Sequence, residues 1–295
     1  MTDLDRGAVP AGRAGGLEST HWEDLLSRPA VEAAPLVLGA VLTVRTPDGG
    51  GGGVPGDVAV RLTEVEAYSG EADPGSHAYR GLTARTAPMF EHGGRLYVYF
   101  TYGMHWCANL VCGTAGTASA LLLRAGEVVS GVDVARARRP AARADRDLAR
   151  GPARLAQALG LTGADSGLEL AVGGRAELTP GERVDPMLVR TGPRVGVAGA
   201  GGDGALFPWR FWIDGEPTVS VYRPAVPRRR CAPPGSGPAS PPGNTGATHC
   251  TGSRPRYLRF GRSAHVPRPA RHTGTRARRA AGPENGRQKS DRHPR

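Results

Sequence analysis

Alternation of apolar and polar residues between positions 58 and 68 predicts a half-buried strand. Successive side chains of a strand point to opposite faces. One face of this strand is therefore expected to carry Val58, Val60, Leu62, Glu64, Glu66 and Tyr68. A face that begins apolar and ends in carboxylates indicates a semi-buried polar site. Burial raises the pKa of a carboxylate and suits it to proton abstraction, although a glutamate salt-bridged at a strand end gives the same pattern.

A second alternating segment, residues 96–111, predicts a β-hairpin. Its first strand has Tyr97, Tyr99 and Thr101 on one face, and Leu96, Val98, Phe100 and Tyr102 on the other. Gly103 permits a reversal, and the returning strand has His105, Cys107, Asn109 and Val111 in phase. Tyr102 and Met104 then lie at the hairpin tip. Large apolar side chains there indicate insertion into a partner, such as a base stack, or packing under a neighbouring loop.

Three helices are predicted around these strands. The first follows Ser27 and Pro29 and covers residues 31–38, with Pro35 expected to kink or divide it. The second covers residues 132–139. The third begins near Pro152, with its buried side formed by Leu155, Ala158 and Leu159. Helices before and among antiparallel strands predict a single α+β domain of about 200 residues.

The net charge of +11 is concentrated at the C-terminal end. Residues 225–295 hold 16 of the 38 Lys and Arg residues and two acidic residues, which leaves a net charge of −3 on residues 1–224. The same segment is rich in Pro and Gly and has four residues among Leu, Ile, Val and Phe, so we expect a disordered tail. It is either a basic tether that strengthens DNA binding or an extension without a role, and truncation after Pro227 distinguishes the two.

Several other site types are disfavoured. The single lysine is Lys289, so residues 1–288 have no side-chain amine for a Schiff base or a P-loop. The GAGGDG stretch at 199–204 lacks the context of a dinucleotide site and is interpreted as a flexible loop. Cys107, Cys112, Cys231 and Cys250 form no C-x-x-C pair, and His105 has no companions at zinc spacing, so no metal or other cofactor is expected.

An ordered set of motifs resembles the alkyladenine (3-methyladenine) DNA glycosylase family. The set comprises EVEAY with a histidine nine residues after its tyrosine, then LYVYFTYGMHWCAN, LLLRA, GPARLAQALG, PRVGV and RFWIDGEPTVSVYR. It extends over roughly residues 26–224. The resemblance implies a curved, mixed but largely antiparallel sheet with a protruding hairpin and surrounding helices, and a closing strand that ends near Arg223. It divides the chain into a flexible N-terminus (1–25), a catalytic domain (26–224) and the tail (225–295).

The resemblance also implies roles for individual residues. Glu66 matches the catalytic glutamate, and Arg124 and the backbone carbonyl of Val195 match its partners around the attacking water. The flipped base would be enclosed by Tyr68, His77 and Tyr99, whose faces attract a cationic purine. Asn109 would obstruct the 2-amino group of guanine. Tyr102, with Met104 beside it, would fill the gap in the duplex.

Glu66 is chosen over Glu64 by this match alone, because periodicity places both on one face. Four arginines near the expected pocket are candidates for phosphate contacts or solvated charges: Arg80, Arg85, Arg95 and Arg194. The expected partner is duplex DNA with damaged purines, bound by a monomer in the cytoplasm at the nucleoid; no signal or membrane-spanning pattern is seen. The expected enzyme is monofunctional and leaves an abasic site. The alternatives are a non-catalytic DNA-binding protein and a sugar hydrolase using Glu64 with Glu66, although two carboxylates on one strand face would not flank a bond.

Overall fold

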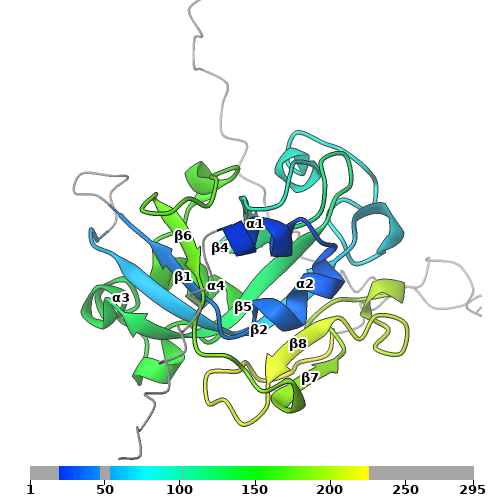
Figure 1. The fold of residues 1–295 in the computed structure, drawn as a ribbon. Helices are drawn as coiled ribbons and strands as arrows, with labels where there is room; N and C mark the ends of the chain where they lie inside the picture. Colours follow the sequence, from blue (N-terminus) through cyan, green and yellow to red (C-terminus); the bar gives the residue numbers. More distant parts are fainter. Residues whose placement is uncertain (1–19, 47–53, 102, 226–295) are drawn as a thin grey trace, which may run out of the picture. The chain divides into compact units, whose positions relative to one another are not determined.

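The computed structural model describes residues 20–46, 54–101 and 103–225, and within them the fold is α+β as predicted (Figure 1). The helices are α1 (Thr20–Leu26), α2 (Ala30–Val37), α3 (Val132–Arg138) and α4 (Pro152–Leu159). The strands are β1 (Val41–Val44), β2 (Val58–Tyr68), β3 (Leu96–Thr101), β4 (His105–Val111), β5 (Ala120–Ser130), β6 (Ala176–Thr179), β7 (Val189–Gly192) and β8 (Arg210–Ile213). Short 3₁₀ turns lie in several of the connections.

Strand β2 is the centre of one antiparallel sheet. The order is β3-β4-β5-β2-β1-β6, and β8 pairs with both β2 and β7. One edge of β2 pairs with β5 from Ala59 to Tyr68, whereas the other edge is shared between two strands. Val58–Arg61 pair with β1, and Glu64–Glu66 pair with β8. The strand therefore changes partner between Arg61 and Glu64.

A pair of β-bulges at this change of partner corrects the predicted face of β2. The register with β5 shifts between Leu62 and Glu64 and again between Glu64 and Val65. An extra residue in one strand reverses the alternation beyond it. Val58, Val60 and Leu62 therefore share the core with Val65 and Ala67, whereas Glu66 and Tyr68 face a pocket. The prediction that the three apolar residues lie on the same face as the glutamates is wrong, because simple alternation does not include the bulge.

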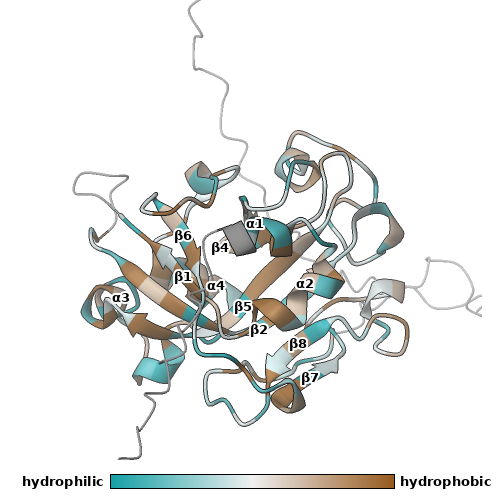
Figure 2. Ribbon diagram, in the orientation of Figure 1, coloured by the Kyte–Doolittle hydropathy of each residue, from teal (hydrophilic) through white to brown (hydrophobic). Residues whose placement is uncertain are grey.

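The helices bury their apolar sides against this sheet. α2 contacts β2, and α4 contacts β4 and β5; Figure 1 shows α1 and α2, in dark blue, in front of the sheet. Leu155, Ala158 and Leu159 are fully buried, as predicted. Figure 2 shows β5 and much of β2 in the brown of hydrophobic residues. One core cluster joins residues of all four helices to residues of the sheet.

Several predicted boundaries need correction. Pro35 lies inside α2 without dividing it, and residues 20–25 belong to helix α1 rather than to a flexible N-terminus. No strand ends near Arg223, because residues 218–225 run along the sheet without strand pairing. The GAGGDG stretch contains a 3₁₀ turn in which Gly201 is buried. A Cβ on Gly201 would lie 2.2 Å from the backbone nitrogen of Gly75, so this loop is closely packed rather than flexible. The predicted disordered tail, residues 225–295, lies outside the described residues apart from Ala225.

Candidate active site

A pocket of about 510 Å³ opens on the face of the sheet opposite its main core. Alternate residues of four adjacent strands line it, because side chains two apart in a strand point to the same face. The loops at residues 74–77 and 195–198 and the start of α4 complete its wall. The strand residues are Glu66 and Tyr68, Tyr97, Tyr99 and Thr101, His105, Cys107 and Asn109, and Leu122 and Arg124.

The Glu66 carboxylate is fully buried in the pocket wall and is held on both oxygens. The amide N–H of Val195 donates to Oε1 at 2.7 Å, and the Tyr68 hydroxyl donates to Oε2 at 3.0 Å. Burial raises the pKa of Glu66, and the nearby Arg124 guanidinium and these two donors oppose that effect. The Val195 contact with the carboxylate is made by its amide, whereas the expected role falls on its carbonyl. The site therefore has a fixed carboxylate of increased basicity facing an open cavity.

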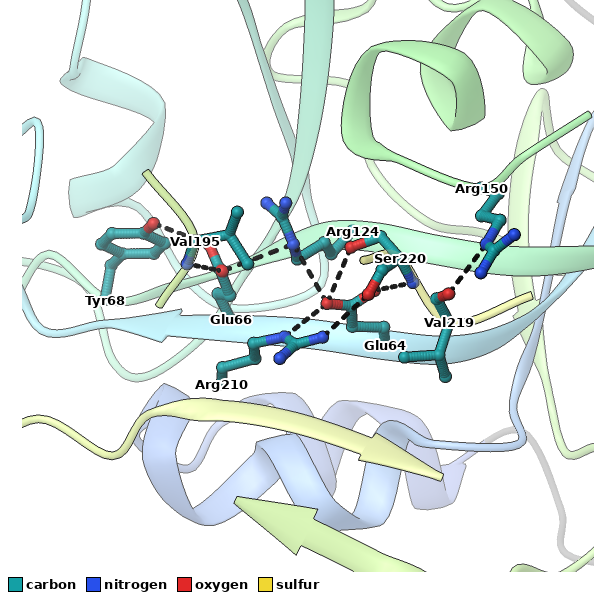
Figure 3. A network of polar contacts seen from close by, with 9 residues as sticks. All are labelled: Glu64, Glu66, Tyr68, Arg124, Arg150, Val195, Arg210, Val219 and Ser220. Carbon is teal, nitrogen blue, oxygen red and sulfur yellow. Dashed lines mark hydrogen bonds and ion pairs between the residues drawn. The ribbon is translucent and has the colours of Figure 1, made fainter. Parts of the chain in front are cut away.

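Arg124 lies between the two glutamates of β2 (Figure 3). Its Nε is 3.0 Å from Glu64 Oε1 and 3.5 Å from Glu66 Oε1. Glu64 is itself fully buried, accepts from Arg210 Nε at 2.6 Å, and lies behind Arg124, outside the pocket lining. The tertiary structure thus distinguishes two carboxylates that periodicity could not separate. Glu66 faces the cavity, and Glu64 faces arginines.

Aromatic rings of β3 and of the loop at residues 74–77 line the same pocket. His77 meets Tyr99 edge to face at a centroid distance of 4.4 Å, and Tyr97 stacks on Tyr99 at 5.5 Å. The pocket walls and the nearby Arg85 guanidinium lower the pKa of His77 to about 4, even though part of the ring stays accessible at the rim. His77 is therefore neutral near pH 7, and it does not repel a cation. Tyr97 had no predicted role, although its position in phase with Tyr99 already placed it on this face.

Asn109 is buried at the floor of the pocket. Its Nδ2 donates to the carbonyl of Tyr97 at 2.9 Å, a cross-strand neighbour in register with it. This hydrogen bond fixes the orientation of the side-chain amide. The expected position of Asn109 as a rigid obstruction in the pocket is thus compatible with its contacts.

The predicted hairpin carries its tip away from the core. Thr101 pairs with His105 across the turn, and Gly103 has a φ of +67°, which favours glycine. Met104 is 67% exposed. Tyr102 lies outside the described residues, so its role as the inserting side chain stays a prediction.

The four candidate arginines divide into two groups. Arg194 is fully buried and pairs with Asp73 through both terminal nitrogens, at 2.6 and 2.7 Å. Arg95 pairs with Glu91 at 3.1 Å and with Glu169 at 2.5 Å. Arg80 and Arg85 are exposed and have no carboxylate partner among the described residues. The assignment of Arg194 to phosphate is wrong, because a buried guanidinium with four acceptors cannot reach a duplex.

Sequence reasoning missed three residues that support the site. Asp73 ties Arg194 in place, and Arg194 lies 4.5 Å from the centroid of the Tyr68 ring. Arg210 and Ser220 both bind Glu64. These contacts join segments more than 120 residues apart in the chain, so no local sequence pattern predicts them.

Other chemistry is not evident in the described residues. Cys107 and Cys112 are buried free thiols, and within residues 20–46, 54–101 and 103–225 no cluster of three His, Cys, Asp or Glu side chains could hold a metal ion. In the same part of the chain, every helix is too short or too polar to cross a membrane.

Comparison with known proteins identifies the family. The sequence model described as methylpurine-DNA glycosylase (MPG) matches residues 24–217. The chain belongs to the methylpurine-DNA glycosylase family. A relative from Streptomyces avermitilis named "Putative 3-methyladenine DNA glycosylase" is 54% identical over 209 residues, which is 70% of this chain and 93% of the relative. Relatives with the same name from Leifsonia xyli and Frankia casuarinae are 52% and 48% identical, over 68% and 70% of this chain and 91% and 93% of their own lengths.

As a methylpurine-DNA glycosylase, the protein is a hydrolase of N-glycosyl bonds that acts on DNA in repair. The predicted family, enzyme class and α+β fold are confirmed. The family match begins inside α1 and ends at Pro217, so it includes every strand that carries a pocket residue.

Proposed function

We propose that this glycosylase removes alkylated or deaminated purines from duplex DNA by rotating the damaged nucleotide into the pocket around Glu66. The observation that carries this proposal is a buried carboxylate, held by two donors, in the wall of an aromatic cavity of about 510 Å³. A base inside a duplex is out of reach of a buried carboxylate. Base flipping, at a cost of a few kcal/mol, brings the glycosidic bond to it.

Recognition of the base falls to Tyr68, His77 and Tyr99. Purines methylated at N3 or N7 are cationic, and a desolvated aromatic face attracts a cation by roughly 0.5–2 kcal/mol. The neutral state of His77 supports this role, because an imidazolium would repel the same ligand. Asn109 excludes guanine by obstructing its 2-amino group, and its fixed amide supports that role.

Hydrolysis uses Glu66 as the general base. Water attacks the anomeric carbon of the deoxyribose, the glycosidic bond breaks, and its electron pair leaves with the base. Glu66 takes a proton from the attacking water, and its charge also stabilises the oxocarbenium character of the sugar. A cationic purine leaves as a neutral base, so it needs no general acid. Arg124 orients the water from the other side of Glu66, together with the carbonyl of Val195.

The reaction ends at an abasic site. Cutting the strand through a Schiff base needs an amine, and residues 1–288 contain no lysine. Duplex DNA would be held by exposed arginines such as Arg80 and Arg85, the second of which lies 5.4 Å from the centroid of the Tyr99 ring, with Tyr102 and Met104 filling the vacated space. We infer that the protein acts as a monomer, since one chain supplies all of these groups.

The test is release of free base from methylated duplex DNA that contains 3-methyladenine and from duplex oligonucleotides that contain hypoxanthine or 1,N6-ethenoadenine. The wild type is expected to release base and leave an alkali-labile site without cutting the strand. Glu66→Gln is expected to keep binding to lesion DNA and to lose at least about 100-fold in single-turnover rate, the usual contribution of a general base. Base release by Glu66→Gln at the wild-type rate would refute the assignment.

A further inference from the structure

Glu64 is the second buried carboxylate of β2, and the reaction proposed above does not use it. Its side chain is fully buried and receives donors from three separate segments. Arg210 Nε of β8 donates to Oε1 at 2.6 Å, Ser220 N donates to Oε2 at 2.7 Å, and the Ser220 hydroxyl donates to Oε1 at 3.1 Å. Arg124 Nε approaches the same Oε1 at 3.0 Å. A carboxylate that accepts this many donors is firmly fixed.

The bulges in the two central strands bring the four charged side chains together. Glu64 and Glu66 both lie beyond the bulge in β2 and share a face there. Arg124 is the extra residue of β5, between Ala125, which pairs with Glu64, and Leu123, which pairs with Val65. Arg210 lies in register with Glu66 on β8. Two carboxylates and two guanidinium groups therefore meet in a nearly solvent-free cluster, where their charges balance.

Within this cluster, Arg124 is shared between the glutamates and is not locked onto either. Its Nε is closer to Glu64 than to Glu66, by 3.0 Å against 3.5 Å. Nε forms no well-aligned hydrogen bond in the described structure, so the attraction is that of an ion pair. Figure 3 shows both terminal nitrogens pointing away from the two carboxylates, and Arg124 lines the pocket.

We propose that Glu64 is a positioning residue that holds Arg124 toward the pocket and keeps its guanidinium from collapsing onto Glu66. The inference rests on the proposed role of Glu66 as the base. Without the charge of Glu64, Arg124 has Glu66 as its nearest carboxylate. Arg124 would then turn its donors from the cavity to Glu66, which would lose basicity and its oriented water.

Glu64 also influences the titration of Glu66. The titratable and charged groups that face Glu66 come from three strands: Glu64 and Tyr68 of β2, Arg124 of β5 and Tyr99 of β3. Glu64 is the like charge in this set, and a like charge favours the protonated form of its neighbour. Its removal is expected to lower the pKa of Glu66 and to shift the acid limb of the pH–rate profile to lower pH.

A purely structural role for Glu64 predicts a different result. Residues 216–220 contact β2 through the Thr63 and Thr218 hydroxyls at 2.9 Å and through the Arg61–Glu216 pair at 2.6 Å, and Arg150 Nε, just before α4, donates to the carbonyl of Val219 at 2.9 Å. Thr218→Val weakens the same segment two residues from Ser220 without touching Arg124. It is therefore the matched control for loss of anchoring.

The experiment compares single-turnover release of 3-methyladenine, which lacks the 2-amino group that Asn109 obstructs, from methylated duplex DNA by the full chain, Glu64→Gln and Thr218→Val between pH 5 and 9. This lesion is cationic, so the acid limb reports the general base and not protonation of the leaving group. Glu64→Gln is expected to lose about 10- to 100-fold in rate, as for a displaced catalytic group, with unchanged DNA affinity and an acid limb shifted to lower pH. Thr218→Val is expected to lower the melting temperature and to leave the acid limb in place.

The proposal is overturned if Glu64→Gln keeps the wild-type rate and acid limb, or if Thr218→Val produces the same changes. Failure of the proposed function is separate, because it appears as no release by the wild type or full release by Glu66→Gln. If Glu64→Gln does not fold, Glu64→Gln/Arg210→Gln replaces it, since removing a buried pair together leaves no unpaired charge. The double variant is expected to show the same loss of rate, and a wild-type rate would overturn the proposal.

Discussion

Asp73→Asn is expected to destabilise the protein strongly by leaving Arg194 buried without its counter-charge. Both side chains are fully buried, and the two contacts of 2.6 and 2.7 Å form a bidentate pair. Loss of one partner of such a pair costs about 3–5 kcal/mol. In a domain of about 200 residues this corresponds to a fall in melting temperature of roughly 6–20 °C.

Asp214→Asn is the matched control, because it breaks the same kind of pair at the surface. Arg190 and Asp214 are 3.0 Å apart with side chains about half exposed. A pair of this kind contributes less than about 1 kcal/mol, so the expected fall is below about 4 °C. Thermal melting followed by circular dichroism compares the two variants at pH 7. Equal melting temperatures for the two would refute the view that burial makes the Asp73–Arg194 pair structurally essential.

The remaining predictions concern charge and pH. Glu66→Gln is expected to melt at the same or a higher temperature than the wild type at pH 8, and the gain in melting temperature is expected to be smaller at pH 4.5. Burial raises the pKa of Glu66 in the folded state, so its ionised form costs stability as pH rises. A melting temperature clearly below wild type at pH 8 would contradict this. Arg85→Ala is expected to reduce the salt slope of DNA binding by about 1. Arg95→Ala removes a guanidinium that is already paired with Glu91 and Glu169, so it is expected to leave the slope unchanged. Binding titrations at several salt concentrations measure both slopes, and equal slopes would show that Arg85 makes no phosphate contact. Because the pKa of His77 is about 4, His77→Phe is expected to have a pH–rate profile of the same shape as the wild type above pH 5. If the variant loses a limb that the wild type shows between pH 5 and 7, His77 titrates in that range.

The charged cluster around Arg124 illustrates how the proposed active site costs stability. Two carboxyl groups and two guanidinium groups of β2, β5 and β8 occupy positions where apolar residues would pack without desolvating polar groups. The arrangement is tolerated because each carboxylate receives donors from several segments. The same desolvation raises the basicity of Glu66. Stability and basicity are therefore coupled through the burial of one group.

The local sequence pattern was sufficient to predict the position of a side chain wherever that position depends on residues nearby in the sequence. Alternation in residues 96–111 predicted which side chains of the hairpin share the pocket face, and the structure has Tyr97, Tyr99, Cys107 and Asn109 there. Proline at the start of α4 and its apolar spacing predicted that helix and its buried side. The ordered motifs identified the family, because a match between sequences does not depend on knowing the tertiary structure.

Only the tertiary structure decided which glutamate faces the pocket and which arginines are exposed. The bulge at Leu62–Glu64 arises where β2 exchanges β1 for β8, and strand exchange depends on partners far along the chain. Arg85 and Arg194 are both arginines, and no local sequence pattern distinguishes them. Nevertheless, Arg85 is exposed, whereas Arg194 is buried against Asp73 and Gly201. The sequence by itself determined the family, the local elements and the residue types available for chemistry. Burial and charge pairing between distant segments determined the environment of each, because desolvation and Coulomb energy depend on distance in space rather than on separation in sequence.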